Sequence, residues 1–189
     1  MSDKALLILA FTDFWISGTG ASRGREADAI PARDKTGFPI MPMSQVKGQL
    51  RETADRLAER GVGGWSVAKV QRLFGEGGDK EAALAFVGEA ALDWKTRSLL
   101  AGDAGRITRF YRTLSATKID ENGVADDYTL REVETVVPVT LFGIVNWKEG
   151  TPDPDWVNLV DHARAATLAF GKLKSDGYGR AIASLEPLK

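Results

Sequence analysis

The order of the predicted elements favours an α+β fold with a ferredoxin-like βαββαβ core that carries inserted loops. Apolar, strand-like segments occur near both ends and in the second half of the chain, and segments with helical periodicity lie between them. A length of 189 residues suits a single domain, 1–189, around one core. The same core underlies the RNA-recognition motif, but the aromatic pattern of that motif is missing.

The first half of the chain predicts a strand, a long loop and two helices. Residues 4–14 are dense in Leu, Ile, Ala and Phe, which is typical of a buried strand. Residues 16–37 form a polar, glycine-rich loop whose length is typical of a functional segment. After a short extended stretch at 38–42, Ser44 is expected to cap a helix, and Ser66 a shorter helix that glycines close.

The middle of the chain predicts three strands. Residues 85–94 and 106–116 are the first two, and the second carries arginine on both of its faces, so periodicity leaves its buried face open. A turn signal follows at 120–123. Residues 130–147 form a long β-rich run, in which Pro138 indicates a sheet edge or a bulge.

The last part of the chain predicts an amphipathic helix and a closing strand. The helix spans 156–170 with Gly171 just past its end, and residues 180–185 complete the sheet. His162, the only histidine, lies in this helix. We assign it a structural or surface role, because no second metal ligand or orienting partner is visible in the sequence.

The composition excludes several kinds of site. The chain has no cysteine, which rules out a disulfide framework, a thiol nucleophile and a Cys-based zinc site. The apolar run at 5–10 is too short for a membrane span and lacks the flanks of a signal peptide. We therefore expect a cytoplasmic protein without a membrane partner.

Charge is distributed unevenly, although the formal net charge is only −1. Residues 44–72 carry a net charge of +3 and residues 93–118 one of +4, whereas residues 120–135 carry −5. Such blocks are often solvated faces that attract each other. Alternatively, a basic face binds phosphate and an acidic edge binds a neighbouring subunit; the charges alone leave both interpretations open.

A glycine-rich segment between the predicted last helix and last strand could hold a ligand. Residues 171–180 read Gly-Lys-Leu-Lys-Ser-Asp-Gly-Tyr-Gly-Arg and combine flexible backbone with three cations that could contact phosphate. The order of residues matches neither a P-loop nor a dinucleotide-binding fingerprint. By itself, the segment could equally serve only to turn the chain.

Three segments together resemble proteins of the RAMP superfamily, which occur in CRISPR effector complexes. Residues 34–48 resemble the stretch in which an Asp, a turn and an apolar strand lead to Pro-Gly-Ser-Ser-Leu-Lys-Gly at the start of a helix. Residues 175–180 resemble the glycine-rich loop Ser-Arg-Gly-Tyr/Phe-Gly-Arg. Residues 119–142 are similar to the β-hairpin thumb of type III backbone subunits, here an insertion at about 115–140. The resemblance runs from about residue 15 to 181.

The resemblance implies RNA contacts in the helix start and in the glycine-rich loop. The chain departs from the pattern at Met43 and Gln45, which replace Gly and Ser, and at Asp176, which replaces an arginine that contacts phosphate. The implied RNA-binding residues are Ser44, Lys47, Gly48, Arg51, Lys172, Lys174, Ser175, Gly177, Gly179 and Arg180.

The resemblance also implies a catalytic position. In RNA-cleaving backbone subunits, a loop Asp precedes the Asp before the strand by six residues, and Asp28 precedes Asp34 by that spacing. A loop carboxylate can bind Mg²⁺ or another divalent cation, or orient a 2′-hydroxyl for attack on the adjacent phosphate. Further metal ligands are unknown. The alternative is that Asp28 is one ordinary acid among 26.

A subunit of this kind would pack beside copies of itself and other CRISPR effector subunits, hold the guide RNA backbone and cleave complementary target RNA. Three alternatives stay open: a non-catalytic scaffold or terminal subunit of the same complex, a guide-processing endoribonuclease, and an unrelated α+β protein. Guide-processing enzymes often use histidine, and His162 lies outside the matched motifs. That alternative is therefore less favoured.

Overall fold

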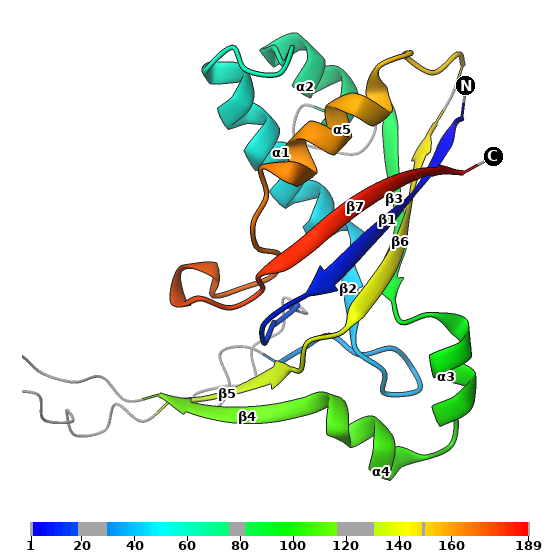
Figure 1. Ribbon diagram of the computed structural model, residues 1–189, viewed down its shortest axis with the longest axis vertical. Helices are drawn as coiled ribbons and strands as arrows, with labels where there is room; N and C mark the ends of the chain where they lie inside the picture. The colour runs from blue at the N-terminus through cyan, green and yellow to red at the C-terminus, as the bar shows by residue number, and fades with distance from the viewer. Residues whose placement is uncertain (1, 19–29, 76–81, 117–130, 149, 189) are drawn as a thin grey trace, which may run out of the picture.

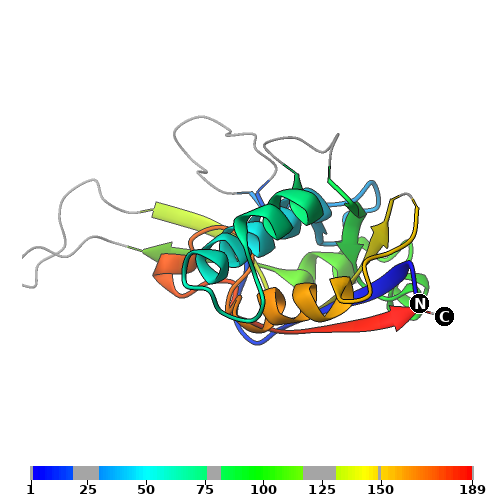
Figure 2. The same ribbon diagram turned by 90° about the horizontal axis from the view of Figure 1, so that it is seen from above.

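A five-stranded antiparallel sheet and the helices on one of its faces form the body of the protein (Figures 1 and 2). The computed structural model describes residues 2–18, 30–75, 82–116, 131–148 and 150–188. The strands lie in the order β2-β3-β6-β1-β7. Their bounds are β1 Lys4–Phe11, β2 Ile40–Pro42, β3 Leu84–Ala91, β6 Thr140–Trp147 and β7 Ala181–Leu188.

Three helices cover one face of this sheet: α1 (Met43–Glu59), α2 (Val67–Phe74) and α5 (Trp156–Ala165). The alternation of β1 explains why, since its odd-numbered residues from 5 to 11 are buried on that face. Gly143 of β6 lets α1 approach closely, because a Cβ at this position would collide with the Met43 side chain. The start of α1 therefore packs on the centre of the sheet.

An insertion between β3 and β6 forms a second region beside the body. It contains α3 (Trp94–Leu100), α4 (Ala104–Ile107), a 3₁₀ turn at Thr108–Phe110, and the strands β4 (Tyr111–Ala116) and β5 (Arg131–Val136). The strands β4 and β5 pair only with each other among the named strands, and the ribbon points away from the body (Figure 1). The insertion was predicted at about 115–140; most of that range, with the turn signal at 120–123, lies between the two strands and outside the described residues.

Several sequence predictions are confirmed. The first strand, the extended stretch before α1 and the closing strand are present. Of the residues with helical apolar spacing in α1, Val46, Leu50 and Ala54 are buried and Leu57 is partly buried. Ser66 caps α2, its side chain accepting a hydrogen bond from the Lys69 N–H. Within the described residues, no helix is both long enough and apolar enough to cross a membrane.

Two predicted helix ends are wrong. Pro42, and not Ser44, occupies the cap position of α1, and no side chain caps that end. The last helix stops at Ala165 instead of residue 170. The following residues turn back to pair with the closing strand, since Ala169 forms a bridge with Arg180 and the Phe170 N–H donates to the Gly179 carbonyl at 2.8 Å.

The strand predictions for the middle of the chain need correction. The strand predicted at 85–94 is β3, which ends at Ala91. The Asp93 side chain caps α3 by accepting a hydrogen bond from the Thr96 N–H. Residues 106–110 are helical, because Asp103 caps α4, and β4 begins only at Tyr111. The run 130–147 holds two strands of different sheets, separated at residues 137–139, which contain Pro138.

Candidate nucleic-acid interface

The start of α1 and the glycine-rich loop, two of the segments implicated in RNA contact, lie side by side in the structure. The buried side chain of Gln49 joins them. Its Nε2 donates to the Gly171 carbonyl at 2.8 Å, and the Gly171 N–H donates to its Oε1 at 3.2 Å. The paired residues are 122 positions apart in the chain. The N–H and the carbonyl of Gly171 therefore both have a hydrogen-bond partner, and this pair of bonds fixes the loop against the helix.

The four implicated residues of α1 share one side of the helix. Ser44, Lys47, Gly48 and Arg51 follow the spacing i, i+3, i+4 and i+7, and all are exposed or half-buried. Arg51 Nε lies 3.7 Å from an Asp55 carboxylate oxygen. An ion pair of this kind at the surface is weak, so the guanidinium can exchange the carboxylate for a phosphate at little cost.

The glycines of the loop serve different purposes. Gly171 and Gly179 have positive φ angles of 107° and 79°, and a Cβ at either position would collide with a backbone carbonyl, of Ile16 or of Phe170. Both are therefore required by the path of the chain itself. Gly177 also has a positive φ, of 92°, but nothing lies within 4 Å of the place where its Cβ would be.

The polar side chains of the loop point in different directions. Lys174 lies toward α1, its Nζ 3.6 Å from an oxygen of the Glu52 carboxylate. The Ser175 hydroxyl donates to the Asp176 carboxylate at 3.1 Å, so Asp176, which departs from the RAMP pattern, is hydrogen-bonded to the neighbouring serine. Arg180 is exposed, while its carbonyl accepts the Thr12 N–H. Among these side chains, Lys174 is the cation that lies beside α1.

Asp34 organises the turn before β2. Its carboxylate accepts hydrogen bonds from the N–H groups of Thr36 and Phe38, at 2.8 and 3.1 Å, and from the Thr36 hydroxyl. Arg97 donates to its other oxygen at 2.6 Å. Burial alone would raise the pKa of Asp34, but the bonds from Thr36 and Phe38 and the charge of Arg97 hold it below the ordinary value. Asp34 therefore caps the turn before β2.

Asp28 lies outside the described residues, but both ends of its loop are described. Gly18 pairs with Pro31 in an antiparallel bridge, and the Ala32 N–H donates to the Ser17 carbonyl at 2.9 Å. The Ser17 hydroxyl donates to the Ile40 carbonyl at 2.6 Å. We call this pinned pair of segments, residues 16–18 and 31–32, the loop neck.

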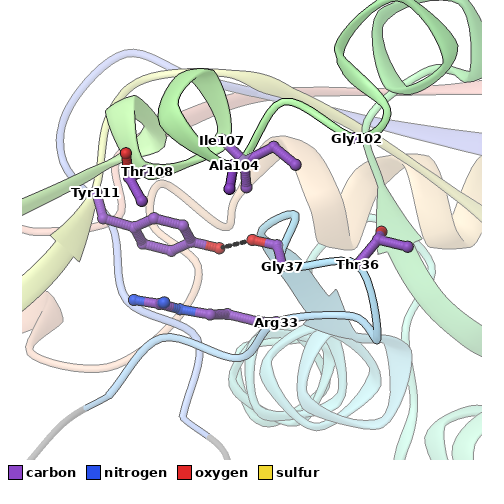
Figure 3. Close-up of a pocket in the computed structure, with 8 residues that line it drawn as sticks. All are labelled: Arg33, Thr36, Gly37, Gly102, Ala104, Ile107, Thr108 and Tyr111. Carbon is purple, nitrogen blue, oxygen red and sulfur yellow. Dashed lines mark hydrogen bonds between the residues drawn. The ribbon is translucent and has the colours of Figure 1, made fainter.

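The sequence did not single out the cluster at the base of the hairpin (Figure 3). The Arg33 guanidinium stacks on the Tyr111 ring, 3.8 Å from its centroid, and donates to a Glu134 carboxylate oxygen at 2.5 Å. Burial raises the pKa of Tyr111 above its ordinary value, so its hydroxyl stays protonated and donates to the Gly37 carbonyl at 2.7 Å. Arg33, Gly37 and Tyr111 line a cavity of about 390 Å³ together with residues of α4.

The sequence left the metal ligands unknown and assigned the single histidine a structural or surface role. Among the residues that the structure describes, no three His, Cys, Asp or Glu side chains cluster as metal ligands. His162 is exposed, with its Nδ1 3.4 Å from the Gly63 carbonyl oxygen. That position fits the surface role inferred from the sequence.

Comparisons with known proteins add a family. The model of the RAMP superfamily matches residues 8–182. No curated protein matches the chain. Two similar solved chains come from cryo-EM structures of the type III-B Cmr-beta complex, one bound to cognate target RNA (TM-score 0.64) and one in the apo state (TM-score 0.66). In both cases the identity is 12% and the match covers 96% of each chain. At this identity, the similarity shows a shared fold.

Proposed function

Because this chain belongs to the RAMP superfamily, we propose that it is a subunit of a type III CRISPR effector complex and holds the backbone of the guide RNA. One observation carries the proposal: Gln49 joins α1 to the glycine-rich loop, and Lys174 of the loop lies 3.6 Å from Glu52 of α1. The source of the similar solved chains, a type III-B complex, supports it. Base pairing would select the target, since contacts to phosphate and sugar carry no sequence information.

A ferredoxin-like core is part of the same proposal. The elements β1, α1, β3, β6, α5 and β7 follow each other in the order βαββαβ, with β2, α2 and the hairpin region as additions. Their strands lie in the order β3-β6-β1-β7, and all three neighbouring pairs are antiparallel. We assign the β4–β5 ribbon to the thumb of this fold.

Cleavage of target RNA by Asp28 is the catalytic part of the proposal. The Asp28 carboxylate orients the 2′-hydroxyl, whose oxygen forms a bond to the adjacent phosphorus while the bond from phosphorus to O5′ breaks. The electron pair of the broken bond goes to O5′. Water takes the 2′ proton and returns one to O5′, which leaves a 2′,3′-cyclic phosphate and a 5′-hydroxyl. The spacing of Asp28 and Asp34 supports this assignment.

We assign no metal ligand to this chain. The described residues contain no suitable group of three ligands. Mg²⁺ usually binds through one or two carboxylates together with substrate phosphates. We therefore propose Mg²⁺ or another divalent cation only as an ion that accompanies the RNA.

The RNA-binding proposal is tested by the salt dependence of guide affinity. The affinity of the parent protein is expected to fall steeply with salt and to depend little on sequence. Lys47→Ala and Arg180→Ala should weaken binding and each reduce the salt slope by about 0.7, since a single-stranded contact is lost. Arg60→Ala, at the far end of α1, removes an exposed charge away from this face and is the control. Binding that does not change with salt would contradict the proposal.

A further inference from the structure

The cavity at the base of the hairpin is not part of the interface described for the guide. It lies between the turn at 33–37 and the segment 102–111, which leads from α3 through α4 into β4 (Figure 3). None of the described residues that line it belongs to α1 or to the glycine-rich loop. Its volume of about 390 Å³ lies in the range of pockets that hold small organic groups. The cavity is therefore a second candidate site.

The walls of this cavity favour an uncharged group over a phosphate. Ala104, Ile107 and the Tyr111 ring give it an apolar lining, and no carboxylate lines it among the described residues. The charged side chain of the lining is Arg33, whose guanidinium donates to a Glu134 carboxylate oxygen at 2.5 Å. Because this ion pair offsets the charge of Arg33, a phosphate would gain little from entering the cavity.

Arg33 offers one face of its guanidinium to a flat ligand. The other face stacks on the Tyr111 ring, which is only 8% exposed (Figure 3). The ring is held by the bond from its hydroxyl to the Gly37 carbonyl, and the guanidinium by its bond to Glu134. The Arg33 side chain is 38% exposed and lines the cavity, so the face turned away from the ring is open. Unpaired RNA bases stack on guanidinium planes of this kind.

Exposed arginines lie next to the lining residues in the chain. The segment 93–118 carries a net charge of +4, which the interface at α1 does not explain. Within it, Arg106 precedes Ile107 and Arg109 follows Thr108, and both arginines are exposed. Arg106 takes part in a surface ion pair, which a phosphate can replace at little cost. The Arg109 guanidinium forms no ion pair with a described residue. An apolar cavity beside such cations fits a nucleotide, which joins a flat base to a charged phosphate.

We infer that this cavity binds one unstacked base of the RNA that the subunit holds. The base stacks on the open face of the Arg33 guanidinium, and Arg109 contacts the adjoining phosphate. The inference rests on the proposed function, which supplies the RNA, and adds a contact to a base where α1 and the glycine-rich loop contact the backbone. Stacking accepts every base, so the contact agrees with binding that depends little on sequence.

Two variants remove the contact in different ways. Ala104→Phe fills the cavity and leaves every arginine in place. Ala104 is exposed, so this change is expected to leave the melting temperature unchanged. Arg33→Lys keeps the positive charge beside Glu134 but loses the planar group on which a base stacks. Ala101→Phe is the matched control, because it adds the same ring to an exposed residue that does not line the cavity.

The experiment measures how much affinity a single base contributes. The full chain is titrated with a single-stranded RNA trimmed to the shortest length that binds, and with copies of it that each lack the base of one nucleotide. In the parent and in Ala101→Phe, loss of the base at one position should weaken binding roughly 5–100-fold, as expected for one stacked base. In Ala104→Phe and Arg33→Lys, the same loss should hardly change the affinity, because the contact is already absent.

The salt dependence of binding separates the base from the phosphate. Ala104→Phe should weaken binding of the intact RNA without changing the salt slope, because no phosphate contact is lost. Arg109→Ala should lower the slope by about 0.7, the value for one contact to a single strand.

Three outcomes would overturn the inference. If loss of a base weakens binding equally in the parent and in Ala104→Phe, no base enters the cavity. If no single base matters and adenosine monophosphate alone binds the parent but not Ala104→Phe, the cavity takes a free nucleotide. If no single base matters and Ala104→Phe lowers the number of copies on a long RNA, the cavity takes a side chain of a neighbouring subunit.

In each of these cases the proposed function stands as long as guide affinity depends on salt and falls in Lys47→Ala. A parent protein that binds no RNA would refute the proposed function and the inference together.

Discussion

At the scale of single residues, Asp34 shows how one carboxylate fixes a turn and links two regions. It receives two backbone N–H groups of its own turn and the guanidinium of Arg97 in α3, and its side chain is only 8% exposed. The turn before β2 and the inserted region beside the sheet are therefore held by the same charge. A carboxylate with a lowered pKa contributes to stability only while it is ionised.

Asp34→Asn is predicted to make stability less dependent on pH. The native pKa of Asp34 lies below that of the unfolded chain, so the ionised group stabilises the protein above about pH 4, the ordinary range for Asp. This stabilisation is lost as pH falls through the native pKa. The difference in unfolding free energy between parent and variant, measured with urea, should be constant from pH 5 to 7 and shrink toward pH 3. A difference of equal size at pH 3 and pH 7 would contradict this account.

Gln49 is the residue on which the site depends most. Gln49→Ala is predicted to lower the unfolding free energy by about 1–3 kcal/mol, because the buried carbonyl and N–H of Gly171 lose their partners. Guide affinity should fall as well, since the loop is released from α1. Gln45→Ala, one turn earlier, is the control, because its Oε1 has no hydrogen-bond partner among the described residues. Urea denaturation and RNA titration of both variants test the prediction.

At the scale of elements, Gly177 and Gly179 of the glycine-rich loop both have a positive φ, but only Gly179 also lacks space for a Cβ. Gly177→Ala is predicted to cost about 1–2 kcal/mol, the usual penalty of a left-handed residue with a Cβ. Gly179→Ala should cost clearly more, because its Cβ would also collide with the Phe170 carbonyl and force apart a backbone hydrogen bond. Denaturation midpoints of the two variants provide the measurement. Equal losses would show that the chain path at Gly179 can relax.

Elements with a strong local signal could be predicted from the sequence, and those decided by distant contacts could not. The apolar spacing of α1 and the Ser66 cap of α2 are local, and both are confirmed. Residues 106–110 alternate as a strand would, yet the Asp103 cap makes them helical. The end of α5 is set by pairing of Ala169 with Arg180, which no local pattern reveals.

In the candidate site, too, the local features could be predicted from the sequence and the contacts between distant residues could not. The two segments implicated in RNA contact were found separately, from their glycine, lysine and arginine patterns. Their junction depends on Gln49 and Gly171, which are 122 residues apart and carry no sequence signal for each other. The stack of Arg33 on Tyr111 was missed for the same reason, because it joins the turn before β2 to the hairpin.

At the scale of the whole molecule, the inserted region gives the protein two different ends. In Figure 1, the β4–β5 ribbon points to one side of the body, and α3 lies on the other side. Lys95 of α3 is exposed, and the acidic residues of 120–135 belong to the ribbon and the sequence between its strands. Complementary ends that do not close on themselves generate a filament.

Head-to-tail assembly along RNA is therefore predicted. Native mass measurement of the protein with a long guide should show several copies on each RNA, and Lys95→Glu should lower the number of copies by opposing the acidic segment 120–135 of the next copy. The effect should weaken at high salt, because exposed charges are screened. A single copy on an RNA long enough for several would contradict the prediction.

The proposed cleavage makes the prediction that depends on the whole assembly. If each copy along the RNA carries one Asp28, target RNA should be cut at regular intervals set by the spacing of the copies, and Asp28→Ala should abolish every cut while guide binding and assembly persist. The products should end in a cyclic phosphate, and removal of divalent cations with EDTA should reduce cutting.

Asp34→Ala is the matched control for the loss of a carboxylate near the same loop. The Asp34 carboxylate accepts hydrogen bonds within its own turn and from Arg97, so this change should lower the stability of the fold more than the cleavage rate. If Asp28→Ala cuts target RNA as fast as the parent complex, the carboxylate is not part of the reaction. The subunit would then be a scaffold that holds RNA and its neighbours, because guide binding depends on α1 and the glycine-rich loop and not on Asp28.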